Sequence, residues 1–69
     1  MIEVFKTDVK DAETAKAVVQ KLLCHFPNSR INFDLHDCDK ILRVEGECIS
    51  VEKIKELISL EGYQAIALQ

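Results

Sequence analysis

The first residues of the chain show an imperfect alternation of apolar and polar side chains. In the segment "IEVFKT", residues 2–7, Ile2 and Val4 fall on one face of an extended chain and Glu3 and Phe5 on the other. Alternation with a period of two predicts a β-strand. We take the face of Ile2 and Val4 as the one that packs on the core, so Phe5 is expected on the open face of the sheet.

Two later stretches have apolar residues three or four positions apart, which is the spacing of an amphipathic helix. The first runs from Ala12 to about His25, with Asp11 as its N-cap. The second begins after Ser50, also a capping residue, and ends at Gly62, which is typical of a helix C-terminus. The apolar stripes consist of Ala15, Val18, Val19, Leu22 and Phe26 in the first helix and of Val51, Ile54, Leu57 and Ile58 in the second.

Three further segments read as strands. They are "RINFDLH" (residues 30–36), "ILRVEGE" (41–47) and "YQAIAL" (63–68), and "DCDK" (37–40) forms a turn between the first two. Alternation within these strands indicates which side chains face the core. The inward residues of the middle two strands are Ile31, Phe33, Leu35, Leu42 and Val44.

The predicted order of elements is β-α-β-β-α-β over a single domain, residues 1–69. Strands interrupted by two helices, with one hairpin in the middle, predict a four-stranded antiparallel sheet with both helices on one face. This is an α+β fold, the ferredoxin-like sandwich. The expected core consists of Val18, Leu22, Ile31, Phe33, Leu35, Leu42, Val44, Ile54, Leu57 and Ile58.

Composition and charge narrow the classes of function. With 48% hydrophobic residues, two Gly and one Pro, the chain is globular rather than disordered. The net charge of −3, with basic and acidic residues interspersed, argues against nucleic acid as a partner. No apolar run approaches the roughly 20 residues of a membrane-spanning helix, and no nucleophile–base pair or phosphate-binding loop is recognisable. We therefore expect a cytoplasmic protein that binds no membrane and is not an enzyme.

Four segments, taken together, resemble the heavy-metal-associated domain of copper chaperones and metal-transporting ATPases. They are the strand-to-helix segment 7–23, "ILRVEGE" (41–47), "VEKIKELI" (51–58) and "EGYQAIAL" (61–68). The resemblance covers nearly the whole chain. It implies the same ferredoxin-like fold and a relation to metal handling.

The metal-binding motif of that family, M-x-C-x-x-C, falls on "VKDAET", residues 9–14. Val9 stands in the place of the methionine and can pack as it does, whereas Asp11 and Thr14 stand in the places of the two cysteines. Cu(I) needs thiolates, and Zn(II) needs a tetrahedral set of thiolates, imidazoles or carboxylates. One carboxylate and one hydroxyl meet neither need. No metal is therefore expected at Asp11 and Thr14.

Two other places hold residues of the types that bind metals. In "HDCD", His36 and Cys38 with a carboxylate are weak candidates for Zn(II) or Ni(II), although Asp also serves the backbone of a tight turn. At the other end of the predicted sheet, Cys24, His25 and Cys48 form either a Cys-His-Cys set or small residues packed near helix ends. Three cysteines without a C-x-x-C pair predict reduced thiols.

Two classes of function follow. In the first, the domain handles metal as a chaperone-like or regulatory relative with a different ligand set. In the second, it is a protein–protein interaction module that kept the fold and lost metal binding. Phe5 and Ile41, apolar residues expected on the open face, favour a protein partner or self-association through that face. No cofactor is expected beyond a weakly bound transition metal.

Overall fold

A computed structural model describes residues 1–68 and confirms the predicted order of elements. The elements are β1 (Ile2–Thr7), α1 (Ala12–His25), β2 (Arg30–Asp34), β3 (Ile41–Glu45), α2 (Val51–Leu60) and β4 (Ala65–Ala67). The last three strands are shorter than predicted. β2 ends at Asp34 because Leu35 and His36 already belong to a turn.

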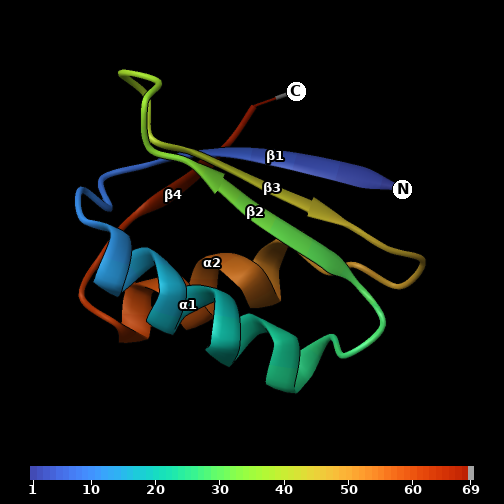
Figure 1. Cartoon of the computed structure of the whole chain (residues 1–69). Helices are drawn as coiled ribbons and strands as arrows, with labels where there is room; N and C mark the ends of the chain where they lie inside the picture. The colour runs from blue at the N-terminus through green and yellow to red at the C-terminus, as the bar shows by residue number, and fades with distance from the viewer. Residues whose placement is uncertain (69) are drawn as a thin grey trace.

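The four strands form one antiparallel sheet in the order β2-β3-β1-β4, so β1 and β3 are central and β2 and β4 are edges. Both helices cover the same face of this sheet (Figure 1). The two central strands pair from Ile2 opposite Glu45 to Lys6 opposite Ile41. This arrangement is the predicted ferredoxin-like α+β fold, and the second face of the sheet is not covered by any element of residues 1–68.

Both helices begin at the predicted caps. The Asp11 carboxylate accepts a hydrogen bond from the Thr14 amide at 3.0 Å, and the Ser50 hydroxyl accepts one from the Lys53 amide at 3.2 Å. Each bond satisfies a backbone N–H that the first helical turn leaves without an intrahelical partner. Each helix therefore begins directly after a residue whose side chain caps the backbone N–H three positions later.

The end of α2 lies at Gly62, as predicted, and its hydrogen bonds form a Schellman motif. The Tyr63 amide donates to the carbonyl of Ile58 at 3.2 Å, and the Gly62 amide donates to that of Ser59 at 2.9 Å. Gly62 has a φ of +89°, a conformation in which a Cβ would be strained. The glycine therefore turns the chain out of the helix and into β4.

The core lies between the sheet and the two helices. The predicted core residues that are buried are Val18, Leu22, Leu42, Val44, Ile54, Leu57 and Ile58. Ile31 and Phe33 pack against this core but are half-buried, because their strand is an edge of the sheet. Leu35 was placed in the core by its spacing, but it lies half-buried in the turn after β2.

The prediction for the two faces of β1 is wrong. Phe5 is 0% exposed and belongs to the core, whereas Ile2 is 53% exposed on the opposite face. Phe5 lies directly opposite Leu42 of β3, and directly opposed residues of an antiparallel pair point to the same face of a sheet. Because Leu42 points to the helices, Phe5 does so too. Ile41 lies on the open face, as predicted.

Candidate functional site

The loop after β1, where no metal is expected at Asp11 and Thr14, leads directly into α1 and is held by two hydrogen bonds between these residues. The Thr14 amide donates to Oδ2 of Asp11 at 3.0 Å, and the Thr14 hydroxyl donates to Oδ1 at 2.8 Å. The hydroxyl bond and then the amide bond stabilise the charged carboxylate, which lowers the pKa of Asp11 from its ordinary value of 3.8. The N-cap role of Asp11 is thus confirmed, and the absence of a metal at these two residues stays a prediction.

The rest of this loop is tied to neighbouring segments. The Thr7 hydroxyl donates to the carbonyl of Lys40 at 2.6 Å and accepts from the Val9 amide at 3.3 Å. Asp8, the other carboxylate of the loop, accepts from the Gln64 amide at 2.9 Å. Val9, in the middle of the loop, is 0% exposed and so is fully packed. The polar groups of the loop therefore serve the connections to the β2–β3 turn and to the start of β4.

The β2–β3 turn brings Asp37, Cys38 and Asp39 together, with their ligand-type atoms within 4.8 Å of one another. It is the one such group found among residues 1–68. His36, which was expected to join Cys38, is not part of it. The reason is that His36 lies in the preceding turn, where its backbone N–H donates to Oδ1 of Asp34 at 3.2 Å.

The members of this group also have partners within the protein. Oδ1 of Asp37 accepts from the Asp39 amide at 2.8 Å, and the Cys38 thiol lies 3.9 Å from Oδ1 of Asp39. Nζ of Lys6 lies 3.6 Å from the same oxygen. Two carboxylates and one thiol suit Zn(II) or Ni(II) better than Cu(I). The same contacts are those of a tight turn, so the geometry is compatible with both interpretations.

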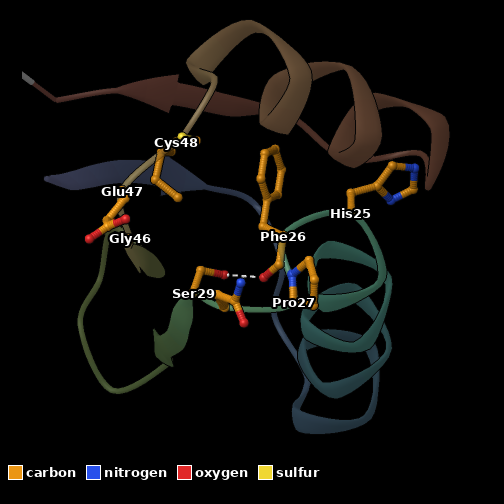
Figure 2. Close-up of a pocket in the computed structure, with 9 residues that line it drawn as sticks. His25, Phe26, Pro27, Ser29, Gly46, Glu47 and Cys48 are labelled. Atoms are coloured by element: carbon orange, nitrogen blue, oxygen red, sulfur yellow. Dashed lines mark hydrogen bonds between the residues drawn. The ribbon is translucent and has the colours of Figure 1, made fainter.

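At the opposite end of the sheet, a cavity of about 520 Å³ lies between the end of α1 and the loop that enters α2 (Figure 2). His25 and Cys48 line it, whereas Cys24 does not. Figure 2 shows the ring of Phe26 between the two, with the imidazole of His25 directed away from Cys48. Nδ1 of His25 instead lies 3.1 Å from the carbonyl oxygen of Lys21. The described residues therefore do not assemble the Cys-His-Cys set.

All three cysteines are free and exposed. The free thiols agree with the prediction, but the expected packing of Cys24 and Cys48 as small apolar residues is wrong. Cys24 follows the buried Leu22 by two positions, and two positions along a helix lead to a different face.

The uncovered face of the sheet carries a group of apolar side chains. We call it the open-face patch, and it consists of Ile2, Val4, Ile41, Ile66 and Leu68. Ile2, Ile66 and Leu68 are 53%, 56% and 42% exposed. The strand register places Lys6 between Ile41 and Ile66, and the Leu68 amide donates to the Val4 carbonyl at 2.8 Å. Of these residues, only Ile41 is predicted on the open face from the sequence, although the alternation of Ile66 and Leu68 also indicates an outward strand face.

Comparison with protein-family models, with curated proteins and with solved structures finds no match to this chain. Within residues 1–68, no helix combines the length and the apolar character needed to cross a membrane. Any functional assignment therefore depends on the surfaces and side chains of this chain itself.

Proposed function

We propose that this chain is a heavy-metal-associated-like domain that binds a protein partner through the open-face patch and does not hold Cu(I) in its first loop. The observation that carries the proposal is the patch. Single exposed apolar residues are common on protein surfaces, but a contiguous group on one uncovered face is typical of an interaction site. Ile2, Ile66 and Leu68 are each more than two-fifths exposed. Leu68 lies beside Val4, and Lys6 separates Ile66 from Ile41 on the same face.

The first loop supports the part of the proposal that concerns metal. Both carboxylate oxygens of Asp11 accept hydrogen bonds from Thr14, and Asp8 accepts one from Gln64. These groups are engaged in capping and in loop connections. A soft cation such as Cu(I) gains little from hard oxygen ligands, so the loop offers it no suitable ligand atoms.

The charges around the patch specify the chemistry of the partner. Lys6 lies between Ile41 and Ile66, and Arg43 lies opposite Val4 on the next strand. The ion pair between Lys6 and Asp39 is exposed, and exposed pairs contribute little stability. Glu45, opposite Ile2, is an exposed carboxylate on the same face. A partner surface with an apolar centre, carboxylates placed to meet Lys6 and Arg43, and a basic group near Glu45 is therefore complementary to this face.

The test compares Ile66→Lys with Leu60→Lys. Leu60 is 72% exposed and lies on α2, away from the open face, so it receives the same charge without altering the patch. Proteins that bind to the parent and to Leu60→Lys but not to Ile66→Lys are purified. The affinity of each for all three proteins is then measured by calorimetry. We expect a stoichiometric complex that Ile66→Lys weakens about tenfold or more and Leu60→Lys leaves unchanged. Equal affinity of all three proteins would exclude the patch as the binding surface.

Metal handling with a different ligand set is the alternative, and the Asp37–Cys38–Asp39 group is the observation that favours it. Reduced parent protein is titrated with Cu(I) in the presence of a chelator of chaperone-range strength, and separately with Zn(II). Native mass spectrometry then counts the bound ions. We expect no retained Cu(I). Stoichiometric Zn(II) that disappears in Cys38→Ser would support metal handling instead.

A further inference from the structure

β2 is an edge strand whose outer side has no neighbour among residues 1–68. It pairs with β3 along its whole length, from Arg30 to Asp34, without a bulge. It also contains no Pro and no Lys, the residues that most often protect an edge from pairing with another chain. The other edge strand, β4, has only three residues. β2 is therefore the edge that offers the longer template for an added strand.

The backbone hydrogen bonds show toward which neighbouring strand the N–H and C=O groups of each β1 residue point. The Leu68 amide donates to the Val4 carbonyl at 2.8 Å, so the backbone groups of Val4 face the β4 side. Successive residues of an antiparallel strand direct their backbone groups to alternate sides. Phe5 and Thr7 therefore face the β3 side. The Thr7 amide confirms this, because it donates to the carbonyl of Asp39, just before β3, at 3.1 Å.

The same alternation can be followed across the sheet to β2. Phe5 faces β3 and is paired with Leu42, so the backbone groups of Leu42 face back to β1. The next residue, Arg43, must then face β2, where its partner is Asn32. The backbone groups of Asn32 are thus used in the ladder with β3. Those of the residues on either side of Asn32 point to the free edge.

These two residues are Ile31 and Phe33, and no turn, loop or side-chain hydrogen bond within residues 1–68 uses their backbone N–H and C=O groups. Their side chains lie on the helix side of the sheet, in an open groove of about 480 Å³ between β2 and α1. The α1 wall of this groove is formed by Ala12, Ala15, Lys16 and Val19. A strand that bonded to Ile31 and Phe33 would place its opposing side chains in the groove.

The sequence of β2, Arg-Ile-Asn-Phe-Asp, is complementary to itself when two copies run antiparallel. With a two-fold axis at Asn32, Arg30 of one copy lies opposite Asp34 of the other, and Ile31 lies opposite Phe33. This register also fits the backbone, because Ile31 and Phe33 are the residues whose N–H and C=O groups face outward. Any shifted register leaves part of the strand unpaired and separates the opposite charges.

We propose that two copies of the chain associate through β2, antiparallel about a two-fold axis at Asn32, to form one continuous sheet of eight strands from two sheets of four. The side chains of Ile31 and Phe33 of each copy enter the groove beside α1. Arg30 and Asp34 form two ion pairs on the open face. Exposed pairs add little stability, but they select the register and direction of pairing. The open-face patch is centred on β1 and β4, so the dimer leaves it accessible and does not depend on the protein partner proposed above.

Charge variants test this register directly. Arg30→Glu places like charges opposite each other in the dimer, and so does Asp34→Lys. Sedimentation equilibrium of each should show association about tenfold or more weaker than in the parent. Mixing the two variants restores both pairs, because each copy then offers the charge that the other needs. The mixture should therefore associate about as tightly as the parent.

Lys55→Glu, at an exposed position on α2, is the matched control for a charge change away from β2 and should associate like the parent. Circular dichroism confirms that each variant is folded, since Arg30 also lies opposite Glu45 within its own sheet. A monomeric parent over the whole concentration range would overturn the proposal. A mixture no tighter than the separate variants would do the same, as would a dimer that Ile66→Lys disrupts and the β2 variants do not.

Amide hydrogen exchange gives a second measurement that needs no substitution. The amides of Ile31 and Phe33 face the free edge and should gain protection as the protein concentration rises. The amide of Asn32 bonds to β3 and should be protected at all concentrations. Exchange at Ile31 and Phe33 that is independent of concentration, in a protein that does dimerise, would place the interface elsewhere.

Discussion

Replacing Phe5 by alanine removes the largest fully buried side chain of the protein from a central strand of its sheet. Phe5 is 0% exposed, and Leu42 and Ala67 lie directly opposite it on the strands to either side. Hydrogen-bonded neighbours on both sides limit how far the sheet can collapse into the space. Substitutions of this kind in a core cost roughly 3–5 kcal/mol, and we expect the upper half of that range here.

This loss of stability is large compared with the total free energy of unfolding expected for so short a chain. At the usual stability per residue, a chain of 69 residues has a free energy of unfolding of roughly 3–10 kcal/mol. Phe5→Ala should therefore leave little or no folded protein if the total lies in the lower part of that range. Phe5→Leu keeps most of the volume and should cost about 1.5 kcal/mol or less, which keeps the variant measurable.

The assay is urea unfolding followed by far-ultraviolet circular dichroism, at one protein concentration, for the parent, Phe5→Ala, Phe5→Leu and Val4→Ala. Val4 is the matched control because it is the adjacent residue and is half-buried on the opposite, uncovered face. Its substitution should cost less than roughly 1 kcal/mol. If Val4→Ala proved more destabilising than Phe5→Ala, the two faces of β1 would be reversed and the register with β3 would be wrong.

Three further predictions concern α1 and its cap. Leu22 is 0% exposed, so Leu22→Ala should cost roughly 2–5 kcal/mol in the same urea assay, and a loss below about 1 kcal/mol would mean that the helix faces the sheet differently. Asp11→Cys combined with Thr14→Cys should create a Cu(I) site, seen as a melting temperature that rises with Cu(I) under reducing conditions; a folded double variant without this rise would end the inferred relation to the metal-binding family. The third concerns pH. Hydrogen bonds from Thr14 lower the folded-state pKa of Asp11 below 3.8. The charged carboxylate therefore stabilises the folded protein above pH 3.8, and this stabilisation is lost as the pH falls through the folded-state pKa. The stability difference between the parent and Asp11→Asn should therefore be constant near neutral pH and shrink in that acidic window, and a difference that does not change with pH would argue against the two bonds.

The helix boundaries of this protein can be predicted from the sequence because they depend on residues close together in the chain. Asp11 caps α1 through Thr14, and Gly62 closes α2 with a bond from the next residue to Ile58. The same locality explains why Ala15, Val18 and Leu22 of the predicted stripe are buried, whereas Val19 and Phe26 are half-buried. Periodicity within one helix reports its buried face without reference to any other element.

The candidate site was only partly predictable, because side chains near in sequence can belong to different turns. His36 and Cys38 are two residues apart, yet the structure groups Cys38 with Asp37 and Asp39 and leaves His36 in the preceding turn. Backbone conformation decides such groupings. Lys40, with a φ of 47° and an amide that donates to the Asp37 carbonyl, closes the turn in a way that residue types alone did not indicate.

The sequence by itself determines the order of the elements, the ends of the two helices and the fold class, because each depends on local patterns and caps. Only the tertiary structure decides that Phe5 rather than Ile2 is buried, because each face of β1 carries both apolar and polar residues and the pairing of Phe5 with Leu42 sets the direction of its side chain. It alone also shows that β2 is an edge and that the backbone groups of Ile31 and Phe33 point away from the sheet. The neighbours of a strand come from distant parts of the chain, so its exposed face and its free edge are properties of the assembled sheet.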